Sequence, residues 1–321
     1  MRKLSLLLAL CMLMPCLLHA TGDGGEWGVV NVSVSNTRAA ADYNAGMESQ
    51  ALLGMPVRVL ETKNEWTKVE TPEHYVHWTL SAAIQRMTRE QLTEWNSGRQ
   101  VVVTALCSSV YELPSAKSQT VSDVVAGNRL RLLARKGRYY RVLYPDGREG
   151  YLSRRDCQPV DSWRSRLDNS PQGIIRTAFT LMGIPYMWGG TSPKGVDCSG
   201  FIRTVLYMHD IIIPRNASQQ ARKGTPVTLD DDFAHLQPGD LLFFGKRNGD
   251  GSPARVQHVG MYIGDKRFIH SLGRVRIASL DSGDPLYDEY DLRRLLSATR
   301  FLPHVNREDG LFTTDESDFY K

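Results

Sequence analysis

This chain of 321 residues has few long hydrophobic runs and only a small excess of positive over negative charge. After residue 20 no segment is apolar enough to cross a bilayer, so the sequence does not indicate stable membrane insertion. The formal net charge is +4, and Arg2 and Lys3 supply two of these charges, which leaves +2 for the remainder. So small a basic excess does not indicate a nucleic-acid partner. The apolar fraction of 41% and the charged fraction of 23% are typical of soluble globular domains.

The N-terminal segment has the layout of a secretory signal. A basic start at Arg2 and Lys3 precedes a leucine-rich run over 4–18, and the small residue Ala20 is followed by a polar, glycine-rich stretch. We therefore expect cleavage after Ala20 and export to the periplasm or the exterior. A lipid anchor on Cys16 is disfavoured, because a proline precedes it where such signals have a small residue.

An internal repeat occupies the first half of the chain. Residues 54–78 match residues 127–151 at a constant offset of 73, without a gap. Both copies alternate apolar and polar residues in short runs, with turn residues between aromatic-bearing segments. The pattern predicts two small antiparallel barrels, the first within 21–98 and the second within 99–160.

Cysteine is rare beyond the signal, where three of the five cysteines remain: Cys107, Cys157 and Cys198. An odd number in an oxidising compartment leaves at least one thiol unpaired. Cys107 and Cys157 fall at the start and end of the second repeat, where the first and last strands of a barrel can lie side by side. They either form a disulfide or stay as two buried thiols.

Helical spacing appears outside the repeats. Residues 82–97 are expected to form a helical linker between the barrels. A new domain over 161–305 opens with a helix behind Ser170 and Pro171, a cap followed by a first-turn proline. The polar tail over 306–321 receives no role.

Cys198 stands at the start of another predicted helix. The apolar residues Phe201, Val205 and Met208 share one face of this helix, so the cysteine belongs to its first turn. There the partial positive charge of the helix N-terminus favours thiolate over thiol. A thiol in this position is a better nucleophile than one in a core.

Two histidines follow on predicted strands. His258 opens an alternating segment over 258–264, and His270 lies on a second strand over 267–271 after a tight turn. Cysteine attack on a carbonyl needs an imidazole base and a third polar group that orients it. Cys198, His258 and His270 can supply these three parts.

The other histidines fit no further chemistry. His209, His235 and His304 fall outside the motifs and are expected on the surface. No cluster of histidines and carboxylates has the sequence spacing of a metal site. We therefore expect neither a metal nor a cofactor.

Residues 170–303 resemble the NlpC-type cysteine peptidases of bacterial cell walls, which have a circularly rearranged papain-like fold. The likeness rests on six motifs in one order: Tyr186-Met187-Trp188-Gly189-Gly190, Asp197-Cys198-Ser199-Gly200-Phe201, Pro214-Arg215, Pro238-Gly239-Asp240-Leu241, His258-Val259-Gly260 and His270. The two repeats resemble bacterial SH3-like domains, and the whole arrangement is similar to the dipeptidyl-peptidase VI group. The implied fold class is α+β, with a papain-like NlpC-type catalytic domain preceded by two small all-β SH3-like barrels.

The resemblance implies a role for the residues of the catalytic motifs. Cys198 would be the nucleophile, His258 its base, and His270 the group that orients His258. Tyr186 would offer its hydroxyl to the oxyanion beside the backbone N–H of Cys198, against the alternative of a buried aromatic residue. Arg215 fits a structural ion pair better than substrate recognition.

The resemblance also implies a site for the amine of the substrate. Asp197 and Ser199 would read the ammonium, although Asp197 could instead only cap the helix. Glu48 and Tyr75 of the first barrel would close the end of the groove, against a reading as ordinary loop residues. The match there is looser, because His77 stands where the family often has glycine.

The implied activity is that of an exported cysteine endopeptidase, acting without cofactor and as a monomer. Its substrates would be peptidoglycan-derived peptides with a free N-terminal L-alanine, cut at the γ-D-glutamyl-L-diamino acid bond, where the diamino acid is lysine or diaminopimelate. Two alternatives stay open. A noncatalytic peptidoglycan-binding protein would not need the set Cys198, His258 and His270, and an N-acyl amidase on a related papain-like fold would not require Asp197.

Overall fold

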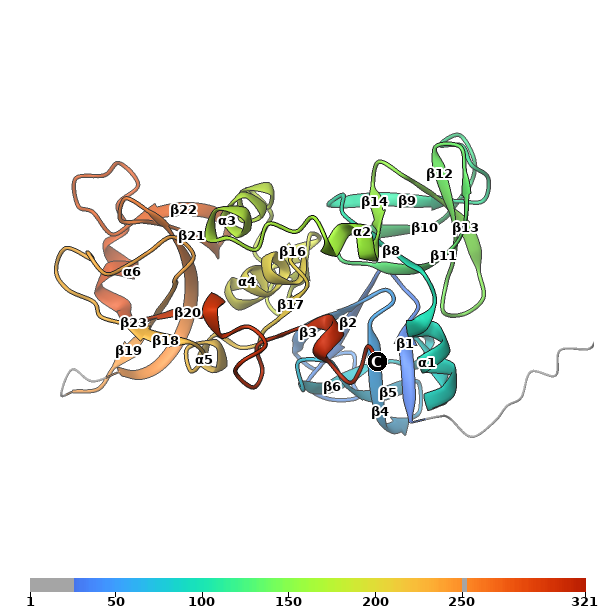
Figure 1. The fold of residues 1–321 in the computed structure, drawn as a ribbon. Coiled ribbons are helices and arrows are strands. Elements are labelled where there is room, and N and C mark those ends of the chain that lie inside the picture. The colour runs from blue at the N-terminus through green and yellow to red at the C-terminus, as the bar shows by residue number, and fades with distance from the viewer. Residues whose placement is uncertain (1–25, 250–252) are drawn as a thin grey trace, which may run out of the picture.

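The computed structural model describes residues 26–249 and 253–321. The secretory signal expected over 1–20 lies outside these residues. Among the helices of the described part, none is long and apolar enough to cross a membrane. Figure 1 shows two all-β units on one side, a mixed helix and sheet domain on the other, and helix α4 (Cys198–Tyr207) toward the middle.

The first all-β unit is a sheet of seven antiparallel strands in the order β3-β2-β6-β5-β4-β1-β7. Its strands are β1 (Trp27–Val30), β2 (Val34–Arg38), β3 (Met47–Leu52), β4 (Pro56–Lys63), β5 (Trp66–Glu70), β6 (Val76–Leu80) and β7 (Ile84–Met87). Strand β4 buries Val57 and Val59 and turns Arg58 to solvent, as the alternation in the sequence predicted.

The second all-β unit repeats the first strand by strand. Its order is β10-β9-β13-β12-β11-β8-β14, and each strand begins 73 residues after its counterpart. The strands are β8 (Gln100–Val103), β9 (Cys107–Tyr111), β10 (Thr120–Val125), β11 (Arg129–Lys136), β12 (Tyr139–Leu143), β13 (Glu149–Ser153) and β14 (Cys157–Pro159). The two predicted barrels are confirmed, and the offset seen over 54–78 extends over all seven strands.

The predicted helical linker over 82–97 is wrong in its first half. A 3₁₀ turn (Ser81–Ala83) is followed by β7, which pairs with β1 and so completes the sheet. Helix α1 (Arg89–Ser97) begins only after Thr88, whose side chain forms a capping box with Gln91.

The two barrel cysteines do not form a disulfide. The first and last strands of the barrel do pair, and Cys157 lies opposite Val103. Cys107, however, belongs to the following strand, β9, and is exposed. The expectation of two buried thiols is therefore correct for Cys157 alone.

The third domain packs helices against a six-stranded sheet in the order β18-β23-β19-β20-β21-β22. The sheet strands are β18 (Thr225–Val227), β19 (Leu241–Arg247), β20 (Pro253–Gly264), β21 (Arg267–Leu272), β22 (Arg274–Ser279) and β23 (Leu295–Arg300). The other elements are α2 (Val160–Arg164), α3 (Pro171–Thr180), β15 (Thr191–Ser192), β16 (Gly195–Val196), β17 (Ile211–Ile212), α5 (Ala217–Gln220), α6 (Glu289–Arg294), β24 (Phe312–Thr313) and 3₁₀ turns at Leu302–His304 and Thr314–Glu316.

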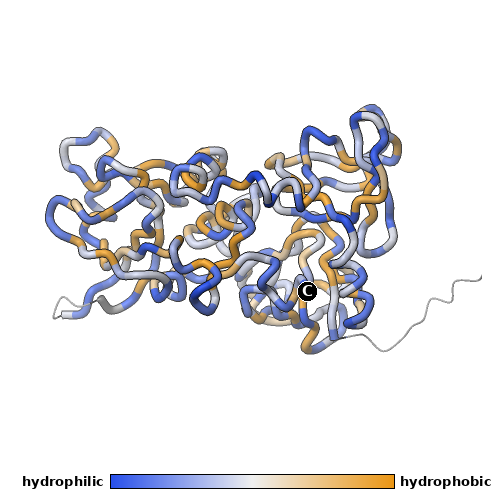
Figure 2. Tube along the Cα trace, viewed as in Figure 1, coloured by the Kyte–Doolittle hydropathy of each residue, from blue (hydrophilic) through white to orange (hydrophobic). Residues whose placement is uncertain are grey.

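Helix α4 forms the centre of this domain and packs against β20 and β21. Phe201, Ile202 and Val205 are completely buried along it. Figure 2 shows hydrophobic residues recurring along the inner elements, while the outer loops are mostly hydrophilic. The predicted start of α3 is confirmed, since the Ser170 side chain accepts a hydrogen bond from Gly173 N ahead of the first-turn proline.

The C-terminal segment 306–321 packs across the molecule, although its sequence suggested no role. Figure 1 shows it, in red, running from the third domain to the first barrel. Phe319 is only 2% exposed and meets the Trp27 ring edge-on at 5.4 Å. The hydroxyl of Tyr320 lies 2.8 Å from that of Tyr207, at the end of α4. Phe319 and Tyr320 therefore hold this polar segment against the first barrel and the end of α4.

Candidate active site

Cys198 is the first residue of α4, as predicted, and is only 8% exposed. The helix is capped by Asp197, whose Oδ1 accepts a hydrogen bond from Gly200 N at 2.7 Å. Glycine is required at position 200, because a Cβ there would lie 1.9 Å from the carbonyl oxygen of Gly190. The close approach of this loop to the helix start fixes the backbone around the thiol.

The two predicted histidines lie on neighbouring strands. Gly260 of β20 pairs with His270 of β21, and His258 precedes that pair on β20. His258 Nε2 and His270 Nδ1 lie 2.8 Å apart, and both rings are buried. The sequence therefore placed both residues correctly, and the ring contact is the one that an orienting group requires.

The thiol of Cys198 lies against the strand that carries His258. Burial, followed by the nearby carboxylate of Asp197, raises the pKa of Cys198 to about 11, although hydrogen bonds from the backbone N–H groups of Ser199 and Val259 act in the opposite direction. The expectation of a thiolate stabilised by the helix N-terminus is wrong for this resting structure. Burial of the sulfur outweighs the helix contribution.

The histidine pair is also neutral at rest. Burial, followed by the charge of Arg294, lowers the pKa of His258 to about 4. Burial and the neighbouring His258 lower the pKa of His270 to about 2. Because thiol and imidazole are both neutral near pH 7, the proton must pass from sulfur to imidazole when the substrate is attacked.

Tyr186 lies close enough to Cys198 for their charges to interact. Burial, followed by the proximity of Cys198 and Asp197, raises the pKa of Tyr186 to about 12. The hydroxyl therefore keeps its proton and can donate it to an oxyanion. As the first residue of α4, Cys198 also has a backbone N–H that the helix does not use. Both predicted oxyanion donors therefore carry a proton, and Tyr186 lies near Cys198.

Asp197 and Arg215 form a buried ion pair beside the nucleophile. Arg215 Nη2 donates to Asp197 Oδ2 at 2.5 Å, and Nη1 donates to Asp197 Oδ1 at 3.2 Å. Nη1 also donates to Ser199 Oγ at 3.0 Å, and Nε donates to Ser49 Oγ of the first barrel at 3.1 Å. The structural ion pair expected for Arg215 is present, and it joins the helix start to β3.

Glu48 and Tyr75 of the first barrel, which the resemblance implies at the end of the groove, are in contact with each other. The hydroxyl of Tyr75 donates to Glu48 Oε2 at 3.0 Å. Burial raises the pKa of Tyr75, while a hydrogen bond from the side chain of Asn216 lowers it. Asn216 follows Arg215 in the chain, so this pair of barrel residues reaches the third domain next to the Arg215 ion pair.

A close backbone contact holds the barrel against the site. Gly189 has a positive φ of 77°, and a Cβ at this position would lie 2.9 Å from the backbone oxygen of Met47, the neighbour of Glu48. Nearby, Thr191 N donates to Gln50 Oε1 at 2.9 Å. The glycine of the tyrosine-containing motif thus permits a contact that brings Glu48 toward the cysteine.

Asp291 joins the histidine pair and was missed from the sequence. Its Oδ2 lies 3.5 Å from His270 Nδ1, and the ligand atoms of Asp291, His258 and His270 all lie within 4.8 Å of one another. Such a donor set suits zinc, but the two imidazole nitrogens are closer than the separation of about 3.3 Å expected around one tetrahedral zinc ion. The arrangement fits a hydrogen-bonded pair better than a metal centre.

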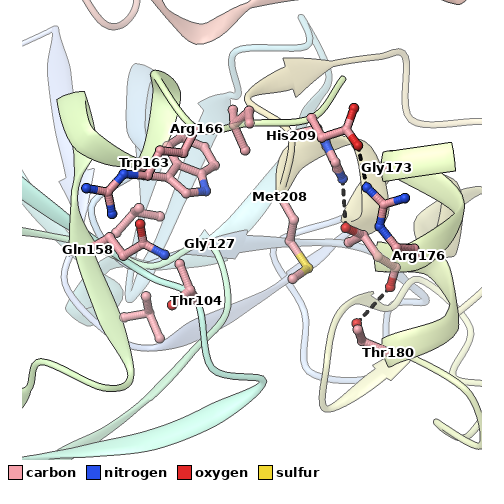
Figure 3. A pocket seen from close by; sticks show the side chains of 15 residues that line it. Thr104, Gly127, Gln158, Trp163, Arg166, Gly173, Arg176, Thr180, Met208 and His209 are labelled. Atoms are coloured by element: carbon pink, nitrogen blue, oxygen red, sulfur yellow. Dashed lines mark hydrogen bonds and ion pairs between the residues drawn. The ribbon is translucent and has the colours of Figure 1, made fainter. Parts of the chain in front are cut away.

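A separate cavity of about 350 Å³ lies between the second barrel and the third domain. Figure 3 shows Gln158 and Trp163 on one side of it and Met208, His209 and Arg176 on the other. His209 was expected on the surface but is 4% exposed, because its ring nitrogens contact Thr177 and Asn169. None of the candidate catalytic residues lines this cavity.

Comparison with known proteins agrees with this geometry. Residues 183–293 match the model of the NlpC/P60 family, and residues 37–84 match that of the bacterial dipeptidyl-peptidase Sh3 domain. The first range contains the cysteine and both histidines. The second range contains Glu48 and Tyr75.

Several relatives share most of their length with this chain. It is 36% identical over 265 residues to a gamma-D-glutamyl-L-lysine dipeptidyl-peptidase of Bacillus cereus, covering 80% of this chain and 76% of that protein. It is 28% identical to dipeptidyl-peptidase 6 of Lysinibacillus sphaericus, with coverage of 84% and 97%. The crystal structure of an NlpC/P60 family protein from Bacillus cereus superposes with a TM-score of 0.71 at 29% identity, over 86% of this chain and all of that one. The chain therefore belongs to the NlpC/P60 family of peptidases, with two SH3-like barrels before its catalytic domain.

Proposed function

We propose that this peptidase hydrolyses the γ-D-glutamyl-L-diamino acid bond of peptidoglycan-derived peptides that carry a free N-terminal L-alanine. One observation carries the proposal: Glu48 and Tyr75 of the first barrel reach the catalytic domain beside Arg215. Arg215 in turn contacts Asp197 and Ser199, the two residues that flank Cys198. A barrel that only tethered the enzyme to the wall would not need this contact. The name of the Bacillus cereus relative, a gamma-D-glutamyl-L-lysine dipeptidyl-peptidase, supports the same bond specificity.

The chemistry follows from the order of the catalytic residues. The Cys198 sulfur attacks the γ-carbonyl carbon of D-glutamate while its proton passes to His258. The carbonyl oxygen becomes an oxyanion that accepts hydrogen bonds from Tyr186 and from Cys198 N–H. When the tetrahedral intermediate collapses, the C–N bond breaks and His258 returns the proton to the leaving amine. Water, deprotonated by His258, then hydrolyses the thioester and releases the L-Ala-D-Glu dipeptide.

Recognition of the amine falls mainly to Glu48. Both oxygens of Asp197 already accept hydrogen bonds, from Gly200, Arg215 and Gly189 among others. Among the described residues no hydrogen bond reaches the second oxygen of Glu48, which leaves it able to accept from an ammonium group. Asp197 and Ser199 then contribute the polar end of the pocket, while Asp197 also keeps its cap and its ion pair.

The test is a product analysis on defined peptides. Purified enzyme should convert L-Ala-γ-D-Glu-L-Lys, or its diaminopimelate counterpart, into L-Ala-D-Glu and the diamino acid, as read from product masses. Cys198→Ala should give no product and keep the wild-type thermal unfolding curve. An N-acyl amidase would instead release L-alanine or cut an acylated amine, and turnover by Cys198→Ala would end the cysteine-peptidase mechanism.

Export forms a separate part of the proposal and rests on the N-terminal sequence alone. The basic start, the leucine-rich run and Ala20 support a cleaved secretory signal. Expression of the full chain and of a variant without residues 2–20, followed by fractionation and N-terminal sequencing, tests it. Mature protein beginning at Thr21 outside the cytoplasm is expected, and an uncleaved cytoplasmic product would contradict export.

A further inference from the structure

Asp291 is a buried carboxylate next to the catalytic histidines. It lies on α6 and has no exposed surface. Within the described part of the chain, its Oδ2 has no hydrogen-bond partner, while Oδ1 lies 3.4 Å from Nη1 of Arg294. A buried carboxylate oxygen without a hydrogen bond destabilises a fold. Such an atom beside a reacting group points to a use in the reaction.

The unpartnered oxygen faces the histidine pair. Asp291 Oδ2 lies 3.5 Å from His270 Nδ1, the same nitrogen that contacts His258 Nε2 at 2.8 Å. A separation of 3.5 Å is too long for a good hydrogen bond. At this distance the carboxylate can still stabilise a positive charge on the pair, because a low-dielectric interior screens the attraction little.

A positive charge arises at this place during the reaction. The proton that leaves the Cys198 sulfur arrives on His258, so the hydrogen-bonded imidazole pair becomes a cation. Both rings are buried, with 6% and 0% of their residue surfaces exposed, and burial of an unpaired cation is unfavourable. The charge therefore needs a buried partner of opposite sign.

The other charged groups around the pair do not meet this need. Those that act on His258 are the cations Arg294 and Arg276 and the anions Asp288 and Asp197. Each of the two anions is already paired with an arginine: Asp288 with Arg276 and Asp197 with Arg215. Asp291 is also paired, through its Oδ1 with Arg294, but among the described residues its Oδ2 has no hydrogen-bond partner and lies 3.5 Å from His270 Nδ1.

We propose that Asp291 is a positioning residue whose carboxylate stabilises the cationic His258–His270 pair formed when Cys198 gives up its proton. The role rests on the cysteine-peptidase function proposed above. No proton leaves Asp291 in the cycle: one proton moves from sulfur to His258 and from there to the leaving amine. Asp291 touches no substrate atom, so it should affect kcat and leave KM unchanged.

The role has a distinctive dependence on pH. Burial, followed by repulsion from Asp288, raises the pKa of Asp291 to about 6. The carboxylate is charged above this pH and neutral below it, so its contribution is present at pH 7 and lost as the pH falls through 6. Protonation of His258, with a pKa of about 4, removes the base only at lower pH.

The experiment measures kcat and KM of wild type and Asp291→Asn on a soluble tripeptide between pH 4.5 and 8. Glu289→Gln, an exposed carboxylate two residues away on α6, is the matched control. At pH 7.5 Asp291→Asn should lower kcat about tenfold to hundredfold, below the contribution of the base itself, with KM within about twofold. The difference should shrink toward zero below pH 5, and Glu289→Gln should follow wild type throughout.

Three results separate the possibilities. A kcat ratio that is constant with pH, or full activity of Asp291→Asn at pH 7.5, would overturn the role of Asp291. Should the variant fold poorly, the wild-type profile still decides: kcat without an acid limb near pH 6 would also refute the role. Cys198→Ala tests the proposed function separately. An inactive Cys198→Ala leaves that function intact whatever the result for Asp291, whereas an active Cys198→Ala would refute it.

Discussion

Arg215 and Asp197 are joined by two hydrogen bonds, of 2.5 and 3.2 Å, and the same guanidinium donates a third hydrogen bond to Ser49 of the first barrel. The residue that caps the nucleophile helix is thereby connected to the barrel that carries Glu48. A planar guanidinium can make these contacts together, whereas an ammonium cannot. Arg215 thus connects the first barrel directly to the residue beside the nucleophile.

Replacement of Arg215 should therefore affect both stability and catalysis. Arg215→Met leaves the buried Asp197 carboxylate without its partner and should lower the free energy of unfolding by about 3 to 5 kcal/mol. Arg215→Lys should retain the charge, lose the contact with Ser49 and reduce kcat/KM. Urea unfolding and steady-state kinetics check both. Arg293→Met, at an exposed pair with Glu289, is the control, and equal effects at 215 and 293 would contradict the bridging role.

The C-terminal segment should stabilise the arrangement of the domains. Phe319 packs against Trp27 of the first barrel and is buried. Phe319→Ala should lower the free energy of unfolding by about 3 to 5 kcal/mol, because it leaves a cavity between the segment and that barrel. Asp318→Ala, whose side chain is 88% exposed, should change it little. Denaturant unfolding of the two variants decides, and indistinguishable curves would show that the segment is not an anchor.

Four buried histidines should make the fold sensitive to mild acid. Burial lowers the pKa of His77, His209 and His258 to about 4 each and that of His270 to about 2, against about 6.5 in the unfolded chain. The unfolded state therefore binds more protons between pH 4 and 6.5. Stability is fully present above 6.5 and falls as the pH drops through this window, by up to about 1.4 kcal/mol per pH unit for each histidine.

Thermal unfolding at several pH values tests this slope. Asp291 acts in the opposite direction, since its raised pKa makes the folded state lose stability as the pH rises from about 4 to 6. The net slope should still favour neutral pH. His209→Gln lies away from the catalytic residues and should flatten the slope, and an unfolding temperature independent of pH between 4.5 and 6.5 would refute the assignment.

The repeat and the catalytic motifs were the parts of the structure that the sequence predicted best. Local alternation and a constant offset identify barrel strands because each strand of one copy has a counterpart 73 residues away. Cys198 and the two histidines were placed correctly because helix starts and tight turns have local signals. These features depend on near neighbours in the chain.

Tertiary contacts set the limits of that prediction. Ile84 and Met87 have helical spacing, yet residues 84–87 form a strand. Their backbone pairs with β1 at the edge of the sheet, and this long-range pairing is not visible in the local sequence. Asp291 stands in an acidic stretch typical of a solvated helix start, and only the packing of α6 against β19 buries it beside His270. His209 was likewise expected on the surface, and the tail that contains Phe319 was given no role, yet both residues are buried by the packing of distant segments.

Discrimination between a free and a blocked amine is the most direct test of how the barrel and the cysteine act together. The measurement is kcat/KM for L-Ala-γ-D-Glu-L-Lys and for its N-acetyl form, in wild type and in Glu48→Gln, with Glu61→Gln on the same barrel as control. Wild type should prefer the free amine by about 30-fold to several thousandfold, because acetylation leaves the half-buried carboxylate of Glu48 without its partner. Glu48→Gln should lose at least tenfold of this preference while Glu61→Gln keeps it. Equal rates on both peptides in wild type, or a preference unchanged in Glu48→Gln, would contradict recognition of the amine by the first barrel.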